Sequence, residues 1–122
     1  MKPGHTGLLR ILKATGFSIQ GIKAGFKHEA AIRQEFVLLA VSVIVAAVFD
    51  FDLTEKCLLV GSVIFLLIVE LLNSAVEAVV DRVGSEFHEL SGRAKDMGSA
   101  AVFFALVLVA MTWFVIFYSH FS

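Results

Sequence analysis

Polar and acidic side chains recur at helical spacing inside an otherwise apolar part of this sequence. The set occupies positions i, i+3, i+4, i+7 and i+11 and consists of Glu70, Asn73, Ser74, Glu77 and Asp81. A helix turns by about 100° per residue, so these side chains lie within one stripe. An ionisable group inside a membrane helix costs at least ~2.5 kcal/mol to insert and usually marks a functional site. We therefore favour a functional role over the alternative that Glu70 and Asn73 only hydrogen-bond to a neighbouring helix.

A second group of charged residues surrounds the segment between the last two apolar stretches. Carboxylates hold Mg²⁺ together with substrate phosphates, and Lys and Arg neutralise phosphate charge. The members of this group are Glu77, Glu86, Glu89, Asp96, Arg82, Arg93 and Lys95. They suit a phosphate-binding site, but the pattern alone favours solvated loop charges. Neither the P-loop motif nor the glycine-rich loop and DFG set of protein kinases is present.

The composition places these residues in a membrane protein. Hydrophobic residues make up 58% of the 122 residues and charged residues 17%, and the mean hydropathy is +0.87. Soluble domains contain only about 45–50% apolar residues. The formal net charge of -1 argues against nucleic acid as a partner. The single cysteine, Cys57, excludes an internal disulfide and a cysteine-based zinc site.

Apolar stretches predict the elements that position the stripe. We expect an all-α membrane protein with a single integral-membrane domain over residues 1–122. Its expected elements are a surface helix over about 5–28 and membrane helices over about 30–49, 56–82 and 92–119. The first helix is amphipathic, because Leu8, Ile11 and Ile19 share one side while basic residues fall largely on the other. Such a helix lies along a membrane surface, close to anionic headgroups.

The distribution of Lys and Arg predicts the orientation of the helices. Six of the ten Lys and Arg residues come before Glu35, and three more lie between the second and third membrane helices. Cytoplasmic segments carry such an excess of positive residues. We therefore expect a cytoplasmic N-terminus, a cytoplasmic segment over 81–96 and an external C-terminus.

Counting residues from the external turn gives the depth of each carboxylate. Glu35 lies 15 residues before Asp50, and Glu70 lies 14 residues after Lys56, so both lie roughly 21 Å from the outer face at about 1.5 Å per residue. Glu77 lies 21 residues after Lys56 and reaches the cytoplasmic surface at roughly 31 Å. The carboxylates therefore form two tiers, one buried near the cytoplasmic edge of the hydrocarbon and one at the surface.

Glu29 is the only acid that comes before Glu35, in a stretch that holds six bases. Its spacing alone favours an ion pair with Arg33, four residues further along the helix.

An uninterrupted run of residues carries a family resemblance. Residues 70–101 read ELLNSAVEAVVDRVGSEFHELSGRAKDMGSAA, and further matching segments are Lys13-Ala14, Glu29-Ala30-Ala31 and Arg33-Gln34-Glu35. The run closely resembles the signature of prokaryotic diacylglycerol kinases. The resemblance implies an enzyme of the bacterial inner membrane that transfers the γ-phosphoryl group of MgATP to diacylglycerol and forms phosphatidic acid. It also implies a homotrimer with active sites shared between protomers, and a periplasmic C-terminus.

The resemblance also implies residue roles. Glu70 resembles the general base of the family, supported by Asn73, and Glu29 and Glu77 resemble its divalent-metal ligands. This implication replaces the ion pair that spacing alone favours for Glu29. Positions that resemble ATP contacts are Arg10, Phe17, Glu29, Glu77, Glu86, His88, Lys95 and Asp96. Positions that resemble lipid-substrate contacts are Arg10, Ala14, Ala31, Glu35, Glu70, Ser99 and Trp113.

Three alternatives stay open at this point. A small proton-coupled exporter has a similar length, but it needs four membrane helices and a glutamate near the bilayer centre, whereas Glu70 is off-centre. A structural oligomer or accessory subunit would use Glu70 for assembly and show no turnover. Within the kinase family, the acceptor could be undecaprenol instead of diacylglycerol.

Overall fold

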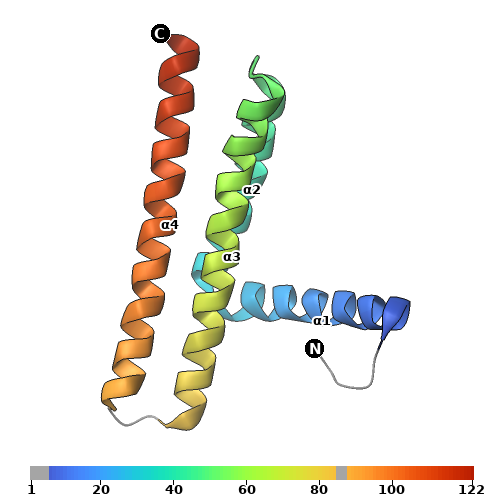
Figure 1. Cartoon of the computed structure of the whole chain (residues 1–122), viewed down its shortest axis with the longest axis vertical. Coiled ribbons are helices and arrows are strands. Elements are labelled where there is room, and N and C mark those ends of the chain that lie inside the picture. Colours follow the sequence, from blue (N-terminus) through green and yellow to red (C-terminus); the bar gives the residue numbers. More distant parts are fainter. Residues whose placement is uncertain (1–5, 85–87) are drawn as a thin grey trace.

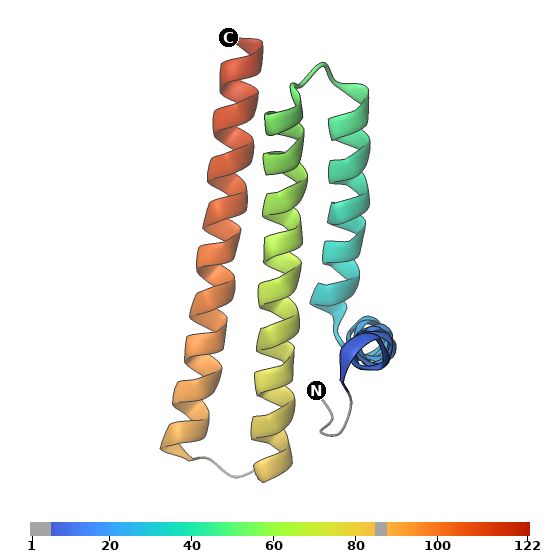
Figure 2. The ribbon, with the colours of Figure 1, turned by 45° about the vertical axis from the view of Figure 1, so that its right-hand side comes forward.

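The protein is all-helical in the residues that its computed structural model describes, 6–84 and 88–122. Its helices are α1 (Gly7–His28), α2 (Ala30–Val48), α3 (Leu53–Val83) and α4 (Glu89–Phe121). Helices α2, α3 and α4 run side by side in alternating directions, and α1 extends sideways from one end of the bundle (Figure 1). Figure 2 shows α3 between α2 and α4, and α3 packs against both neighbours.

The three long helices are suited to crossing a membrane. Helices α2, α3 and α4 are each long and apolar enough to span a bilayer, and large apolar side chains such as Val37, Phe104 and Phe114 are exposed on the outside of the bundle. Lipid covers such side chains in a membrane. The expected all-helical class with three membrane helices is confirmed, and the chain is a multi-pass membrane protein.

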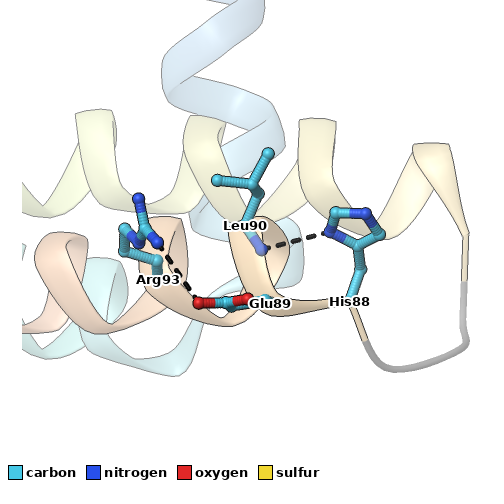
Figure 3. A network of polar contacts seen from close by, with 4 residues as sticks. All are labelled: His88, Glu89, Leu90 and Arg93. Carbon is cyan, nitrogen blue, oxygen red and sulfur yellow. Dashed lines mark hydrogen bonds and ion pairs between the residues drawn. The ribbon is translucent and has the colours of Figure 1, made fainter.

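Local side-chain chemistry sets where α3 and α4 begin. Asp52 accepts a hydrogen bond from the backbone of Glu55 at 2.8 Å, and Glu55 accepts one from the backbone of Asp52 at 2.9 Å. This capping box starts α3 at Leu53, three residues earlier than expected. At the start of α4, Nδ1 of His88 accepts a hydrogen bond from the backbone N–H of Leu90 at 3.1 Å (Figure 3). Helix α4 therefore begins at Glu89 instead of near residue 92.

An arginine fixes the corner between α1 and α2. Glu29 separates the two helices in an extended conformation, with φ of -122° and ψ of 114°. Nη1 of Arg33 donates hydrogen bonds to the carbonyl oxygens of Phe26 at 2.8 Å and Lys27 at 3.2 Å. A cation at these carbonyls is favourable, because the C-terminal end of a helix carries a partial negative charge. The ion pair of Arg33 with Glu29 that spacing alone favours is wrong, since Arg33 binds α1 instead.

Aromatic rings hold the far end of the bundle together. We define the aromatic end cluster as Phe49, Phe51, Trp113, Phe117, His120 and Phe121, whose rings contact one another with centroids 4.5 to 6.4 Å apart. Phe51 is the most deeply buried of its phenylalanines, at 4% exposure. The indole N–H of Trp113 faces the carbonyl oxygen of Leu59 and the hydroxyl of Ser62, each at 3.2 Å. The cluster joins the connection between α2 and α3 to the end of α4.

Helix length separates an inner end from this outer end. Helix α3 has 31 residues and α2 has 19, so α3 extends roughly 18 Å further than α2. The extension lies at the α1 end of the bundle (Figure 2). It carries the polar stripe, and the first turns of α4 run beside it.

Candidate active site

Two buried carboxyl groups face each other between α2 and α3. Glu35 on α2 and Glu70 on α3 are 9% and 8% exposed, respectively, and their side chains are close enough to interact electrostatically. The expectation that they share one depth is confirmed. Oε1 of Glu35 is buried without a hydrogen-bond partner among the described residues. Such an atom is a ready acceptor for a hydroxyl group, because an unsatisfied buried oxygen costs stability until a donor reaches it.

One turn further along α3, an amide orients a carboxylate. Nδ2 of Asn73 donates a hydrogen bond to Oε1 of Glu77 at 2.9 Å. Oδ1 of Asn73 is buried and has no partner within residues 6–84 and 88–122. This oxygen lies against Gly98 of α4, where the Cβ of any other residue would overlap it. The amide is therefore held between Glu77 on its own helix and the backbone of α4.

A lysine from α4 joins the same tier. Nζ of Lys95 lies 2.8 Å from Oδ1 of Asp81, and both side chains are partly exposed. Glu77 also acts electrostatically on the Lys95 ammonium group. An exposed ion pair of this kind contributes little to stability. It does place a cation beside the carboxylates, where phosphate groups would need one.

Glu29 lies on a different side of α3. It lines a groove of about 550 Å³ between α1 and α3, which is also lined by Gly25, His28, Leu71, Ser74 and Ala78. Gly25 keeps the two helices close, because an added Cβ would come within 3.2 Å of the Leu71 side chain. Ser74 belongs to the polar stripe but faces this groove, whereas Asn73 and Asp81 face α4. Side chains of the polar stripe therefore face two different neighbours of α3, namely α1 and α4.

Several expected site residues are not brought together within one chain. Arg10 and Ala14 line a depression formed by α1 alone, and Figure 1 shows this part of α1 pointing away from the bundle. Phe17 lies on the same helix, and its side chain is 38% exposed. Asp96 lines a depression formed by α4 alone, on a face that differs from the one bearing Lys95 and Gly98.

The remaining expected residues are divided between the two ends. Ala31 is half-buried at the start of α2, and Ser99 is exposed beside Gly98. Trp113 belongs to the aromatic end cluster, and its partner Leu59 lies 11 residues from Glu70 along α3, roughly 16 Å. His88 caps α4 beside an exposed ion pair of Glu89 and Arg93 at 3.4 Å (Figure 3). Glu86 lies outside the described residues.

The donor set fits a divalent cation that binds together with phosphates. The described residues hold no group of three or more His, Cys, Asp or Glu side chains placed to bind a metal. Mg²⁺ needs less from a protein, because it is usually held by one or two carboxylates, with waters and substrate phosphates as its other ligands. Glu77 is held by Asn73, and Glu29 has no ion pair in the described ranges. These two carboxylates are chemically suited to Mg²⁺.

Two contacts of this site were not predicted by the sequence pattern. Gly98 is one of nine glycines, and nothing in its spacing indicates contact with an amide. Arg33 was expected to pair with Glu29, although it binds the end of α1. The only sequence signal for the contact between Arg33 and α1 was a basic residue four positions after the helix break at Glu29.

Comparison with known sequences identifies the family. The sequence profile described as prokaryotic diacylglycerol kinase matches residues 16–117. The chain belongs to the prokaryotic diacylglycerol kinase family. Among curated relatives, the diacylglycerol kinase of Escherichia coli (strain K12) is 53% identical over 122 residues, which is the whole of both chains.

Two further relatives extend this similarity within the family. The diacylglycerol kinase of Pseudomonas aeruginosa is 53% identical over 110 residues, covering 90% of this chain and 89% of the relative. The diacylglycerol kinase of Helicobacter pylori (strain J99) is 35% identical over 111 residues, covering 91% and 87%, respectively. The matched family range includes both carboxyl tiers and Lys95, whereas Arg10 and Ala14 precede it.

Proposed function

We propose that this chain phosphorylates diacylglycerol at the cytoplasmic face of the bacterial inner membrane, with ATP as phosphoryl donor and phosphatidic acid as product. The observation that carries the proposal is the 53% identity to a diacylglycerol kinase over the full length of both chains. On this evidence the chain is a diacylglycerol kinase, a membrane enzyme of lipid metabolism. The exporter and the accessory subunit without turnover are set aside for the same reason.

Glu70 is the proposed general base. The acceptor is the free hydroxyl of diacylglycerol, whose acyl chains stay in hydrocarbon while the glycerol group lies at the boundary. The hydroxyl oxygen attacks the γ-phosphorus, the bond to the β–γ bridging oxygen breaks, and ADP leaves with that oxygen. Glu70 is proposed to take the hydroxyl proton, because its carboxyl group is buried and the residue count from the outer turn places it near the boundary. Glu35 offers a second acceptor oxygen beside it and is proposed to help orient the lipid.

The surface tier is proposed to bind MgATP. Glu77, oriented by Asn73, would hold the metal, and Glu29, in the groove between α1 and α3, would supply a second carboxylate in the assembled site. The metal would neutralise phosphate charge when bound. Lys95 lies beside this tier and is proposed to contact the transferring phosphate. Phosphoryl transfer depends mainly on such positioning and charge neutralisation. Arg10, Phe17, Glu86, His88 and Asp96 remain proposed ATP contacts, and Ala14, Ala31, Ser99 and Trp113 remain proposed lipid contacts.

Assembly from several copies is part of the proposal. Within one chain, Asp96 and Lys95 lie on different faces of α4. The part of α1 that carries Arg10 points away from the bundle and therefore from Glu70. A complete site therefore requires surfaces from more than one chain, and we propose a homotrimer with shared active sites. The excess of Lys and Arg near the N-terminus supports a cytoplasmic N-terminus and a periplasmic C-terminus.

The test is transfer of labelled phosphate from MgATP to dioleoylglycerol in mixed micelles, with undecaprenol as a parallel acceptor. We expect phosphatidic acid from the wild type and a loss of kcat of about 10²- to 10⁴-fold in Glu70→Gln. The matched control is Glu55→Gln at the outer end, because glutamine also completes a capping box. If only undecaprenol is phosphorylated, the acceptor is undecaprenol and not diacylglycerol. If folded protein transfers phosphate to neither acceptor, the proposal is overturned.

A further inference from the structure

A glycine of α4 makes room for the amide that orients Glu77. A Cβ added at Gly98 would overlap Oδ1 of Asn73 and also come within 3.2 Å of its Cγ. The glycines at 16, 21, 61 and 84 have nothing within 4 Å of such an added atom. Gly98 is therefore specifically constrained by a side chain on the neighbouring helix.

The obstacle to a larger residue at position 98 is a side chain. The three heavy atoms nearest to an added Cβ are Oδ1, Cγ and Cβ of Asn73, and none of them belongs to the backbone of α3. A larger residue at position 98 would therefore displace the Asn73 side chain before it displaced the helices. Rotation of that side chain takes Nδ2 away from Oε1 of Glu77.

We propose that Gly98 is a positioning residue for the metal site, because its missing Cβ lets Asn73 lie against α4 and hold the Glu77 carboxylate in place. The inference rests on the proposed role of Glu77 as a metal ligand. It also accounts for the buried, unpartnered Oδ1 of Asn73. Bonding Nδ2 to Glu77 turns the opposite end of the amide toward the glycine. Groups that orient a metal ligand typically change metal affinity by about 10- to 100-fold when altered.

The experiment compares full-length Gly98→Ala with Gly61→Ala, a matched change on α3 with no neighbour within 4 Å. Two quantities are measured: the Mg²⁺ concentration for half-maximal activity, and Mn²⁺ binding by electron paramagnetic resonance with a non-hydrolysable ATP analogue. We expect Gly98→Ala to weaken both by about tenfold or more, with an unchanged KM for dioleoylglycerol. Gly61→Ala should change each by no more than about twofold. Equal effects of the two variants would overturn the proposal.

A double variant tests whether Gly98 acts through Asn73. Alanine at position 73 keeps only the Cβ, which lies 3.9 Å from a Cβ added at position 98, so Gly98→Ala should not weaken Mn²⁺ binding further in an Asn73→Ala background. If the two substitutions instead weaken Mn²⁺ binding by independent factors that multiply in the double variant, the proposal is contradicted. If Gly98→Ala alone does not fold, the double variant should recover folding, and its failure to do so would also count against the proposal.

Glu77→Gln separates this inference from the proposed function. If it weakens Mn²⁺ binding while Gly98→Ala does not, the metal site stands and only the role of Gly98 falls. If Glu77→Gln leaves Mn²⁺ binding and the Mg²⁺ requirement unchanged, the assignment of Glu77 as a ligand fails, and the role of Gly98 fails with it.

Discussion

The outer and inner ends of the helical bundle are built from opposite kinds of contact. At the outer end, aromatic rings pack against one another and the Trp113 indole N–H has acceptors. At the inner end, Glu35 and Glu70 are buried together, and one oxygen each of Glu35 and Asn73 has no partner among the described residues. Unsatisfied buried oxygens cost stability. The comparison indicates that the outer end stabilises the bundle, while the inner end is organised for ligands.

The largest expected effect on stability comes from Phe51→Ala at the outer end. Phe51 is 4% exposed and contacts the rings of Phe117, His120 and Phe121. Truncating a buried phenylalanine costs about 3 kcal/mol or more. We expect the free energy of unfolding, measured by denaturant titration in detergent, to fall by about that amount, with kcat per folded enzyme unchanged. A large loss of kcat without a loss of stability would contradict the assignment of the outer end to stability alone.

A smaller effect is expected at the corner beside Glu29. Arg33→Met removes the hydrogen bonds to the carbonyl oxygens of Phe26 and Lys27 but keeps an unbranched apolar side chain. The corner that places Glu29 then loosens, and we expect the Mg²⁺ concentration for half-maximal activity to rise about tenfold. Lys56→Met at the outer end is the control, measured in the same Mg²⁺ titration. An equal rise in both variants would show that the Mg²⁺ requirement does not depend specifically on the corner beside Glu29.

The smallest effect is expected from Asp81→Asn. The ion pair of Asp81 with Lys95 joins side chains that are 66% and 47% exposed, and exposed pairs contribute only about 0.2–1 kcal/mol. Unfolding should therefore change by less than about 1 kcal/mol. Because Lys95 is released toward the nucleotide, the KM for ATP should fall by about twofold at low salt and less at high salt. A rise in that KM would instead show that Asp81 holds Lys95 in its productive position.

The sequence predicted more of the bundle than of the site. Three apolar stretches were sufficient for the membrane helices, and counting residues from the outer turn was sufficient to pair Glu35 with Glu70. The helix starts were predicted three residues late at Leu53 and Glu89, because single capping side chains decide them. The family resemblance supplied residue roles that spacing alone did not, and reversed the interpretation of Glu29.

The site could not be derived completely because its contacts join residues far apart in the chain. Nothing near Gly98 in the sequence indicates that Asn73, which belongs to the preceding helix, fills the space beside it. Ser74 and Asn73 are adjacent on one predicted stripe, yet they face α1 and α4, respectively. A stripe is wide enough to meet two neighbouring helices, and only their packing decides which residue meets which.

By itself the sequence determined the number of membrane helices, the depth of the carboxylates and the family. These properties depend on hydrophobicity, on helical rise per residue and on matching residues in register, all of which are local along the chain. Only the tertiary structure decided that Arg33 caps α1, that Asn73 lies against Gly98 and that Lys95 meets Asp81. Those contacts depend on how far apart the helices lie and how each is rotated about its axis, which side-chain packing across the whole bundle determines.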